Sequence, residues 1–283
     1  MKRISLIPNI ITAFGLAIGL FVIFKVNMIE PGTGNFEMVK NAVLLLLLVA
    51  LADFVDGAVA RAFKAHSDFG LMFDSLADAI SFGVAPSVLL LKTLSLDHGT
   101  ILSFTVATGA MIYSLCGMLR LVRFNTKSIE AKGNIVEMSI QNKNFTGLPI
   151  PAAAAVAVST NLFLLSPYLL NFVDISNITR AITLTVINII LGYLMVSRWK
   201  FPSLKRLNFR MPSFNLAFFT VLVAVLFLYG IFYYFSLVLL IISWVYIFIA
   251  FVLSIIRLIA GKKSKTLKDF DPDDDDDNDQ LNF

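Results

Sequence analysis

Long apolar runs alternate with short polar segments along most of this chain. The runs are long enough to cross a bilayer as helices, at about 20 residues per crossing, and they cover approximately Ile10–Met28, Val39–Phe63, Leu71–Leu91, Ile101–Leu121, Pro149–Val173 and Ile178–Ser197. The uncharged stretch from Met211 to Ile256 has the length of two helices, with a turn at Tyr233–Ser236. The pattern predicts an all-α polytopic membrane protein with about eight transmembrane helices.

Composition supports a membrane protein. Of the 283 residues, 58% are hydrophobic and 15% are charged, and the mean hydropathy is +0.82. Soluble domains carry about 25% charged residues. The single cysteine, Cys116, excludes an intramolecular disulfide, and the two histidines, His66 and His98, lie too far apart in sequence for a metal-ligand motif.

Four carboxylates interrupt the second and third apolar runs. Asp53 and Asp56 share one helical face with Gly57 and Ala60, at spacings of i, i+3, i+4 and i+7. Gly70, Asp74 and Asp78 share a face of the next helix. Because an ionisable group inside a membrane costs several kcal/mol, such residues are functional by default. Four carboxylates in one cleft need neutralisation, and oxygen ligands favour Mg²⁺ or Mn²⁺, so all four are candidate metal ligands.

The residues around the aspartates suit a diphosphate ligand. Gly57, Ala60 and Gly70 leave room for a ligand against the helix backbone, and Arg61 adds a planar cation that can bind phosphate. The alternative is a structural cluster of ion pairs between helices. Four aspartates beside one arginine make that alternative the weaker one.

The pattern D-x2-D-G-x2-A-R-x8-G-x3-D-x3-D, from Asp53 to Asp78, resembles the signature of the CDP-alcohol phosphotransferase family at every fixed position. Other segments resemble the phosphatidylserine synthase branch of that family, and the likeness covers roughly residues 5 to 205. These segments are Ile7–Thr12, Ser81–Pro86, Arg120–Asn125, Gly147–Pro151 and Leu194–Ser197.

The resemblance implies an enzyme that transfers a phosphatidyl group from CDP-diacylglycerol to L-serine and releases CMP. It implies that Asp53, Asp56 and Asp74 hold one or two divalent cations and that Asp78 is the general base. Gly57, Ala60, Arg61 and Gly70 are then expected to bind substrate. Weaker candidates for substrate binding are Asn9, Thr12, Arg120 and Arg123, and for the two arginines ordinary charge anchoring at the membrane edge is an equal alternative. The resemblance also implies a homodimer. No nucleic-acid partner is expected.

Charge predicts the orientation. All but four of the 23 Lys and Arg residues fall on one side of the eight predicted spans, and the exceptions are Lys25, Lys40, Lys92 and Arg180. The positive-inside rule places both termini and the Arg61 turn in the cytoplasm. We expect a six-span family core over residues 1–205, two additional transmembrane helices over 206–260, and a disordered basic-then-acidic cytoplasmic tail over 261–283.

Two alternatives for function stay open at this level. The same chemistry can serve another acceptor, namely glycerol-3-phosphate, inositol or inositol phosphate, although the few cations near the aspartates favour a less anionic alcohol. A cation transporter also uses intramembrane aspartates. The second half of the chain holds no duplicate of the Asp53–Asp78 pattern, which argues against a transporter built from repeats.

Overall fold

The computed structural model describes residues 6–30, 32–63, 67–97, 99–130, 144–197, 199–202, 230 and 233–260. Its elements are α1 (Leu6–Asn27), α2 (Phe36–Ala62), α3 (Asp68–Asp78), a π-helical segment (Ala79–Val84), α4 (Ala85–Thr93), α5 (Ile101–Glu130), α7 (Ile150–Leu164), α8 (Pro167–Leu170), α9 (Asn177–Val196) and α11 (Phe235–Ala260). Two three-residue strands, β1 (Asn144–Thr146) and β2 (Lys200–Pro202), pair antiparallel. The described chain is therefore helical apart from this short ribbon.

Six stretches of the described residues are long and apolar enough to cross a membrane. They are α1, α2, the continuous Asp68–Thr93 unit, α5, α9 and α11. Their starts lie within four residues of the predicted ones, while α5 continues to Glu130, nine residues past its predicted end. Apart from residue 230, the predicted seventh span, from 211 to about 232, lies outside the described residues, and so does the predicted tail. The chain is a multi-pass integral membrane protein.

The predicted span Pro149–Val173 is wrong at its end. Helix α7 stops at Leu164, and Ser166 then caps the short α8, whose first residue is Pro167. A proline lacks the N–H that would continue the α7 ladder, and it fits the first turn of a new helix. The 15 residues of α7 rise about 22 Å, which is less than a bilayer core.

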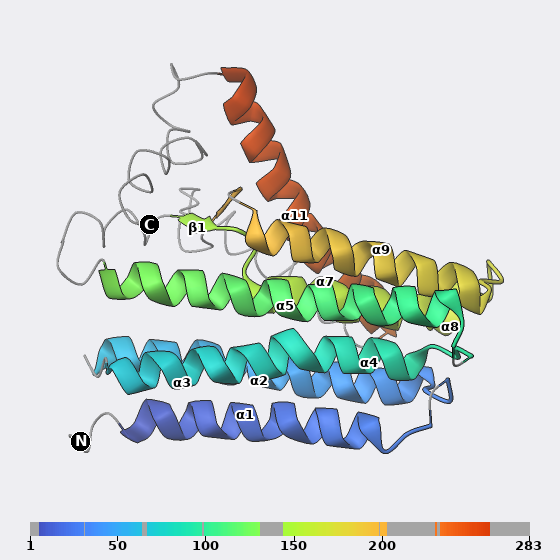
Figure 1. Ribbon diagram of the computed structural model, residues 1–283, viewed down its shortest axis with the longest axis horizontal. Helices are drawn as coiled ribbons and strands as arrows, with labels where there is room; N and C mark the ends of the chain where they lie inside the picture. The colour runs from blue at the N-terminus through green and yellow to red at the C-terminus, as the bar shows by residue number, and fades with distance from the viewer. Residues whose placement is uncertain are drawn as a thin grey trace, which may run out of the picture.

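The long helices α1, α2, α5 and α9 lie side by side, and α11 runs obliquely to them (Figure 1). Helix α1 packs along α2, α5 packs along α9, and α7 packs against α9 and α11. The core between them is apolar and includes Val43, Leu89, Leu148, Leu162 and Leu191, all at most 1% exposed. Large apolar side chains also cover the outside, among them Phe14, Phe21 and Phe24 of α1. This is the expected surface of a protein whose solvent is lipid.

Candidate metal centre

Two helix ends place three aspartates opposite one another. Asn35 caps α2 by accepting a hydrogen bond from the Met38 N–H at 2.9 Å, and the helix runs unbroken to Ala62. Ser67 caps α3 by accepting from the Gly70 N–H at 3.0 Å. Serine and asparagine are preferred at this position because their side chains satisfy free N–H groups of the first turn. The chain reverses between the two helices, so the end of α2 lies beside the start of α3.

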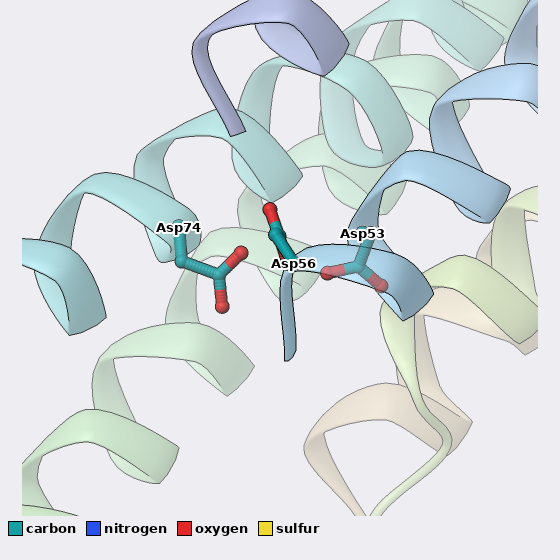
Figure 2. Close-up of side chains that lie close together, drawn as sticks. All are labelled: Asp53, Asp56 and Asp74. Carbon is teal, nitrogen blue, oxygen red and sulfur yellow. The ribbon is translucent and has the colours of Figure 1, made fainter. Parts of the chain in front are cut away.

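Asp53, Asp56 and Asp74 form a compact group of carboxylates. Each offers one oxygen, and these oxygens all lie within 4.8 Å of one another. Figure 2 shows Asp53 and Asp56 on α2 with Asp74 across from them. Asp56 is only 4% exposed, whereas Asp53 and Asp74 are half-buried.

The charge of this group calls for a cation. Two unit charges 4.8 Å apart repel by about 3.5 kcal/mol at an effective dielectric constant of about 20. No Lys or Arg among the described residues pairs with any of the three carboxylates within 4.0 Å. Three carboxylates with only oxygen donors are the ligand type that hard divalent cations prefer. The donor set therefore fits a metal ion of the Mg²⁺ or Mn²⁺ class.

Asp78 lies beside this group rather than within it. It follows Asp74 by one helical turn, and it interacts electrostatically with Asp53, Asp74 and Asp56. It also interacts with Arg120, which comes from α5. The predicted convergence of the carboxylates is thus seen, with three of them at metal-binding distance and the fourth next to a cation.

Helix α1 supplies two polar groups to the same place. The Thr12 hydroxyl is buried, and it lies 2.5 Å from Asp56 Oδ2 and 3.0 Å from the Pro8 carbonyl. The shorter contact directs its proton to the carboxylate, so Thr12 orients Asp56. The Asn9 side chain lies against Gly70, where an added Cβ would be 3.1 Å from Asn9 Oδ1. Both predicted α1 residues therefore lie at the aspartate site.

The small residues and Arg61 form one edge of the site. Arg61 is exposed, and its guanidinium folds back along α2, where a Cβ on Gly57 would be 3.4 Å from Nη1. Ala60 is half-buried and follows Asp56 by one turn. Because Gly57 has no side chain, the guanidinium lies close to the helix backbone one residue after Asp56.

The structure gives the two α5 arginines different surroundings. Arg123 donates to the backbone carbonyls at the end of α9, at 2.7 Å to Val196 and 3.4 Å to Met195 and Ser197. It therefore caps that helix and opposes its negative end. Arg120 is 8% exposed and interacts electrostatically with Asp78, so of the two arginines it is the one associated with the aspartates.

Sequence reasoning missed some neighbours of the site. Ser75 donates a hydrogen bond of 3.0 Å to Asn125 Oδ1 and so ties α3 to α5 between Asp74 and Asp78. Tyr246 of α11 interacts electrostatically with Arg120. The Ser67 cap carried a signal, because serine before a polar first turn is typical of a helix start. Tyr246 carried none, since it lies in an uncharged apolar run.

Comparison with known proteins agrees with this geometry. A family model described as CDP-alcohol phosphatidyltransferase matches residues 5–187. The chain is 34% identical to the CDP-diacylglycerol–serine O-phosphatidyltransferase of Methanocaldococcus jannaschii, over 62% of this chain and 71% of that protein. Proteins of the same name from Helicobacter pylori strain 26695 and Bacillus subtilis are 32% and 34% identical. These alignments cover 76% and 71% of this chain, and 80% and 92% of the relatives.

Proposed function

The chain belongs to the CDP-alcohol phosphatidyltransferase family, and we propose that it transfers a phosphatidyl group from CDP-diacylglycerol to L-serine. The products are phosphatidylserine and CMP. The phosphatidyl transfer is supported most directly by the three carboxylate oxygens within 4.8 Å of one another. Serine as the acceptor is supported by the names of the relatives from three different organisms.

The cation would be held by Asp53, Asp56 and Asp74, whose oxygens suit Mg²⁺ or Mn²⁺. When bound, a divalent ion neutralises charge on the diphosphate and on the departing CMP. Thr12 holds the buried Asp56 carboxylate in one orientation through its hydroxyl. Arg61 binds a phosphate oxygen, and the surfaces of Gly57, Ala60 and Gly70 let the nucleotide approach the helices. Asn9, which touches the Gly70 surface, contributes a polar contact.

Asp78 acts as the general base in this proposal, and it also borders the metal site. The serine hydroxyl oxygen forms a bond to the phosphorus of the phosphatidyl group, and its proton passes to Asp78. The bond from that phosphorus to the CMP oxygen breaks, and CMP leaves with the electron pair. A base next to the metal ligands but outside their group of three is well placed for this step, because it remains available to the acceptor.

The membrane arrangement is part of the proposal. We place the aspartate site and both termini on the cytoplasmic side, since the basic residues gather there in the predicted topology. We propose that residues 1–205 form a six-span core in which the shorter α7 counts as one span, and that residues 206–260 add two helices. We also propose that the protein is a homodimer.

The test is CMP release by the purified protein with Mg²⁺ or Mn²⁺. CDP-diacylglycerol is supplied with serine, glycerol-3-phosphate, inositol or inositol phosphate, each alone. Serine-dependent release that is lost in Asp78→Asn, and retained in the control Asp97→Asn at the other end of the helices, supports the proposal. Release with a different acceptor would refute serine, and release that persists in Asp78→Asn would refute the general base.

A further inference from the structure

Helix α11 lies outside the residues that the family model matches, yet it is fixed tightly against them. Ser243 Oγ is 2.8 Å from Ser159 Oγ of α7, and the Trp244 indole N–H donates to Thr160 Oγ1 at 3.2 Å. Further along, Phe251 stacks on Trp199 with ring centres 5.0 Å apart. These contacts set both the position and the rotation of α11 on α7 (Figure 1).

This rotation turns Tyr246 toward the interior. Tyr246 follows the buried Ser243 by three residues and precedes the buried Ala250 by four, so all three share one helical face. Tyr246 packs against the core cluster that contains Leu121 of α5. Arg120 is the residue before Leu121, and Tyr246 interacts electrostatically with its guanidinium.

Arg120 is an unusual cation for a membrane interior. It is only 8% exposed, and its Nε has no hydrogen-bond partner among the described residues. Arg120 and Asp78, both of which the structure describes, interact electrostatically without forming an ion pair within 4.0 Å. Burying an unpartnered donor on a charged group is unfavourable. A guanidinium whose buried Nε lacks a hydrogen-bond partner has the planar fork that receives a carboxylate with two parallel hydrogen bonds.

We propose that α11 completes the acceptor subsite, with Arg120 binding the carboxylate of the acceptor and Tyr246 holding the Arg120 guanidinium in place. The inference rests on the proposed function and adds which side chain recognises the acceptor. Two carbons separate the hydroxyl of serine from its carboxylate. In this arrangement the serine hydroxyl lies at Asp78, which takes its proton, and the serine carboxylate lies at Arg120. Tyr246 is a positioning residue, because it acts on the acceptor through Arg120.

The experiment compares L-serine with L-serinamide, which keeps the hydroxyl and replaces the carboxylate with a neutral amide. The purified full chain is assayed for CMP release from CDP-diacylglycerol, as wild type and as Tyr246→Phe, Arg120→Lys and Arg120→Met. The matched control is Tyr193→Phe, which removes the same oxygen from a tyrosine on the outer face of α9 that is 67% exposed. A thermal melt of each variant verifies folding.

We expect Tyr246→Phe to raise KM for serine by about three- to tenfold, as for loss of one modest polar contact, while kcat and KM for CDP-diacylglycerol stay within about twofold. Tyr193→Phe should match the wild type. Arg120→Met should bring kcat/KM for serine to the level for serinamide, and Arg120→Lys should restore part of the preference by restoring the charge.

Three outcomes would overturn the subsite. One is Tyr246→Phe changing kcat and both KM values equally, because that is the result of general destabilisation. Another is a folded Arg120→Met enzyme that still prefers serine to serinamide as the wild type does. In both, serine-dependent release by the wild type would leave the proposed function standing. A wild type that releases CMP without regard to serine would refute both proposals.

Discussion

The hydrogen bond from Thr12 to Asp56 gives the sharpest test of the metal site. Thr12→Val removes the hydroxyl and keeps the shape of the side chain almost unchanged. The lost contact is short, at 2.5 Å, and it is buried between α1 and α2. The competing acceptor, the Pro8 carbonyl at 3.0 Å, belongs to the helix in which Thr12 lies. The substitution therefore acts mainly on Asp56.

A hydrogen bond to a charged group contributes about 1.5–3 kcal/mol, which corresponds to about 10- to 150-fold in a binding constant. Loss of a partner that orients a metal ligand weakens metal affinity by about 10- to 100-fold. We therefore expect the Mg²⁺ or Mn²⁺ concentration that half-activates CMP release to rise by about 10- to 100-fold in Thr12→Val. Activity at saturating metal should recover much of the wild-type value.

Two variants separate this effect from loss of any buried threonine. Thr185→Val removes a buried hydroxyl that donates only to the Ala181 carbonyl four residues earlier, at 2.8 Å, and it should leave metal activation unchanged. Thr12→Ser keeps the hydroxyl and should stay close to the wild type. If a folded Thr12→Val protein shows the wild-type metal activation curve, then Asp56 does not hold the activating ion through this contact.

Three further outcomes are expected. Tyr113→Phe leaves the buried Phe82 carbonyl without the donor it now has at 2.9 Å, so thermal or denaturant unfolding in detergent should show a loss of about 1–3 kcal/mol relative to Tyr193→Phe. Gly19→Ala brings a methyl group to 2.9 Å from Ser81 Cβ and should destabilise by about 1–3 kcal/mol, whereas Gly15→Ala, one turn earlier with its nearest atom at 3.6 Å, should be tolerated in the same measurement. Chelation of divalent cations should abolish CMP release, and Mg²⁺ or Mn²⁺ but not Na⁺ should restore it; release that survives chelation would refute a divalent requirement.

The aspartate site was predictable from sequence because its signal is local and periodic. Asp53 and Asp56 share a face by helical spacing, and the neighbouring Asp74 follows after one short turn, so the chain has few ways to keep them apart. The different contacts of Arg120 and Arg123 could not be predicted in this way. Both lie on one face of α5 three residues apart, and only the packing of α9 and α11 decides that Arg123 caps α9 while Arg120 interacts electrostatically with Asp78.

The predicted helix boundaries were wrong where hydropathy and helix-capping residues point to different ends. Residues 149–173 read as one apolar span, but Ser166 and Pro167 start a new helix within it. The ribbon of β1 and β2 was also missed, because its two strands are separated by more than 50 residues and are only three residues long. Two strands this short and this far apart produce no alternating hydrophobic pattern that would predict their pairing.

The π-helical segment shows how tertiary contacts set the geometry of the site. Pro86 cannot donate to the carbonyl of Phe82, and the wider turn of Ala79–Val84 leads into it. Two α5 side chains satisfy this stretch: the Tyr113 hydroxyl donates to Phe82 O at 2.9 Å, and Ser114 Oγ donates to Gly83 O at 2.9 Å. Phe82 lies four residues after Asp78, and Tyr113 lies seven residues before Arg120.

The two helices run antiparallel here, so the Tyr113 bond fixes their register one to two turns from the site. The distance between Asp78 and Arg120 then depends on that bond, because both residues extend from the same pair of helices. The sequence pattern does not reveal this dependence, because Tyr113 and Ser114 reach the segment before Pro86 only when α5 packs against it. The motif contributes the carboxylates, and the π-helical turn before Pro86 contributes the carbonyl that the Tyr113 bond holds, which keeps Arg120 near Asp78.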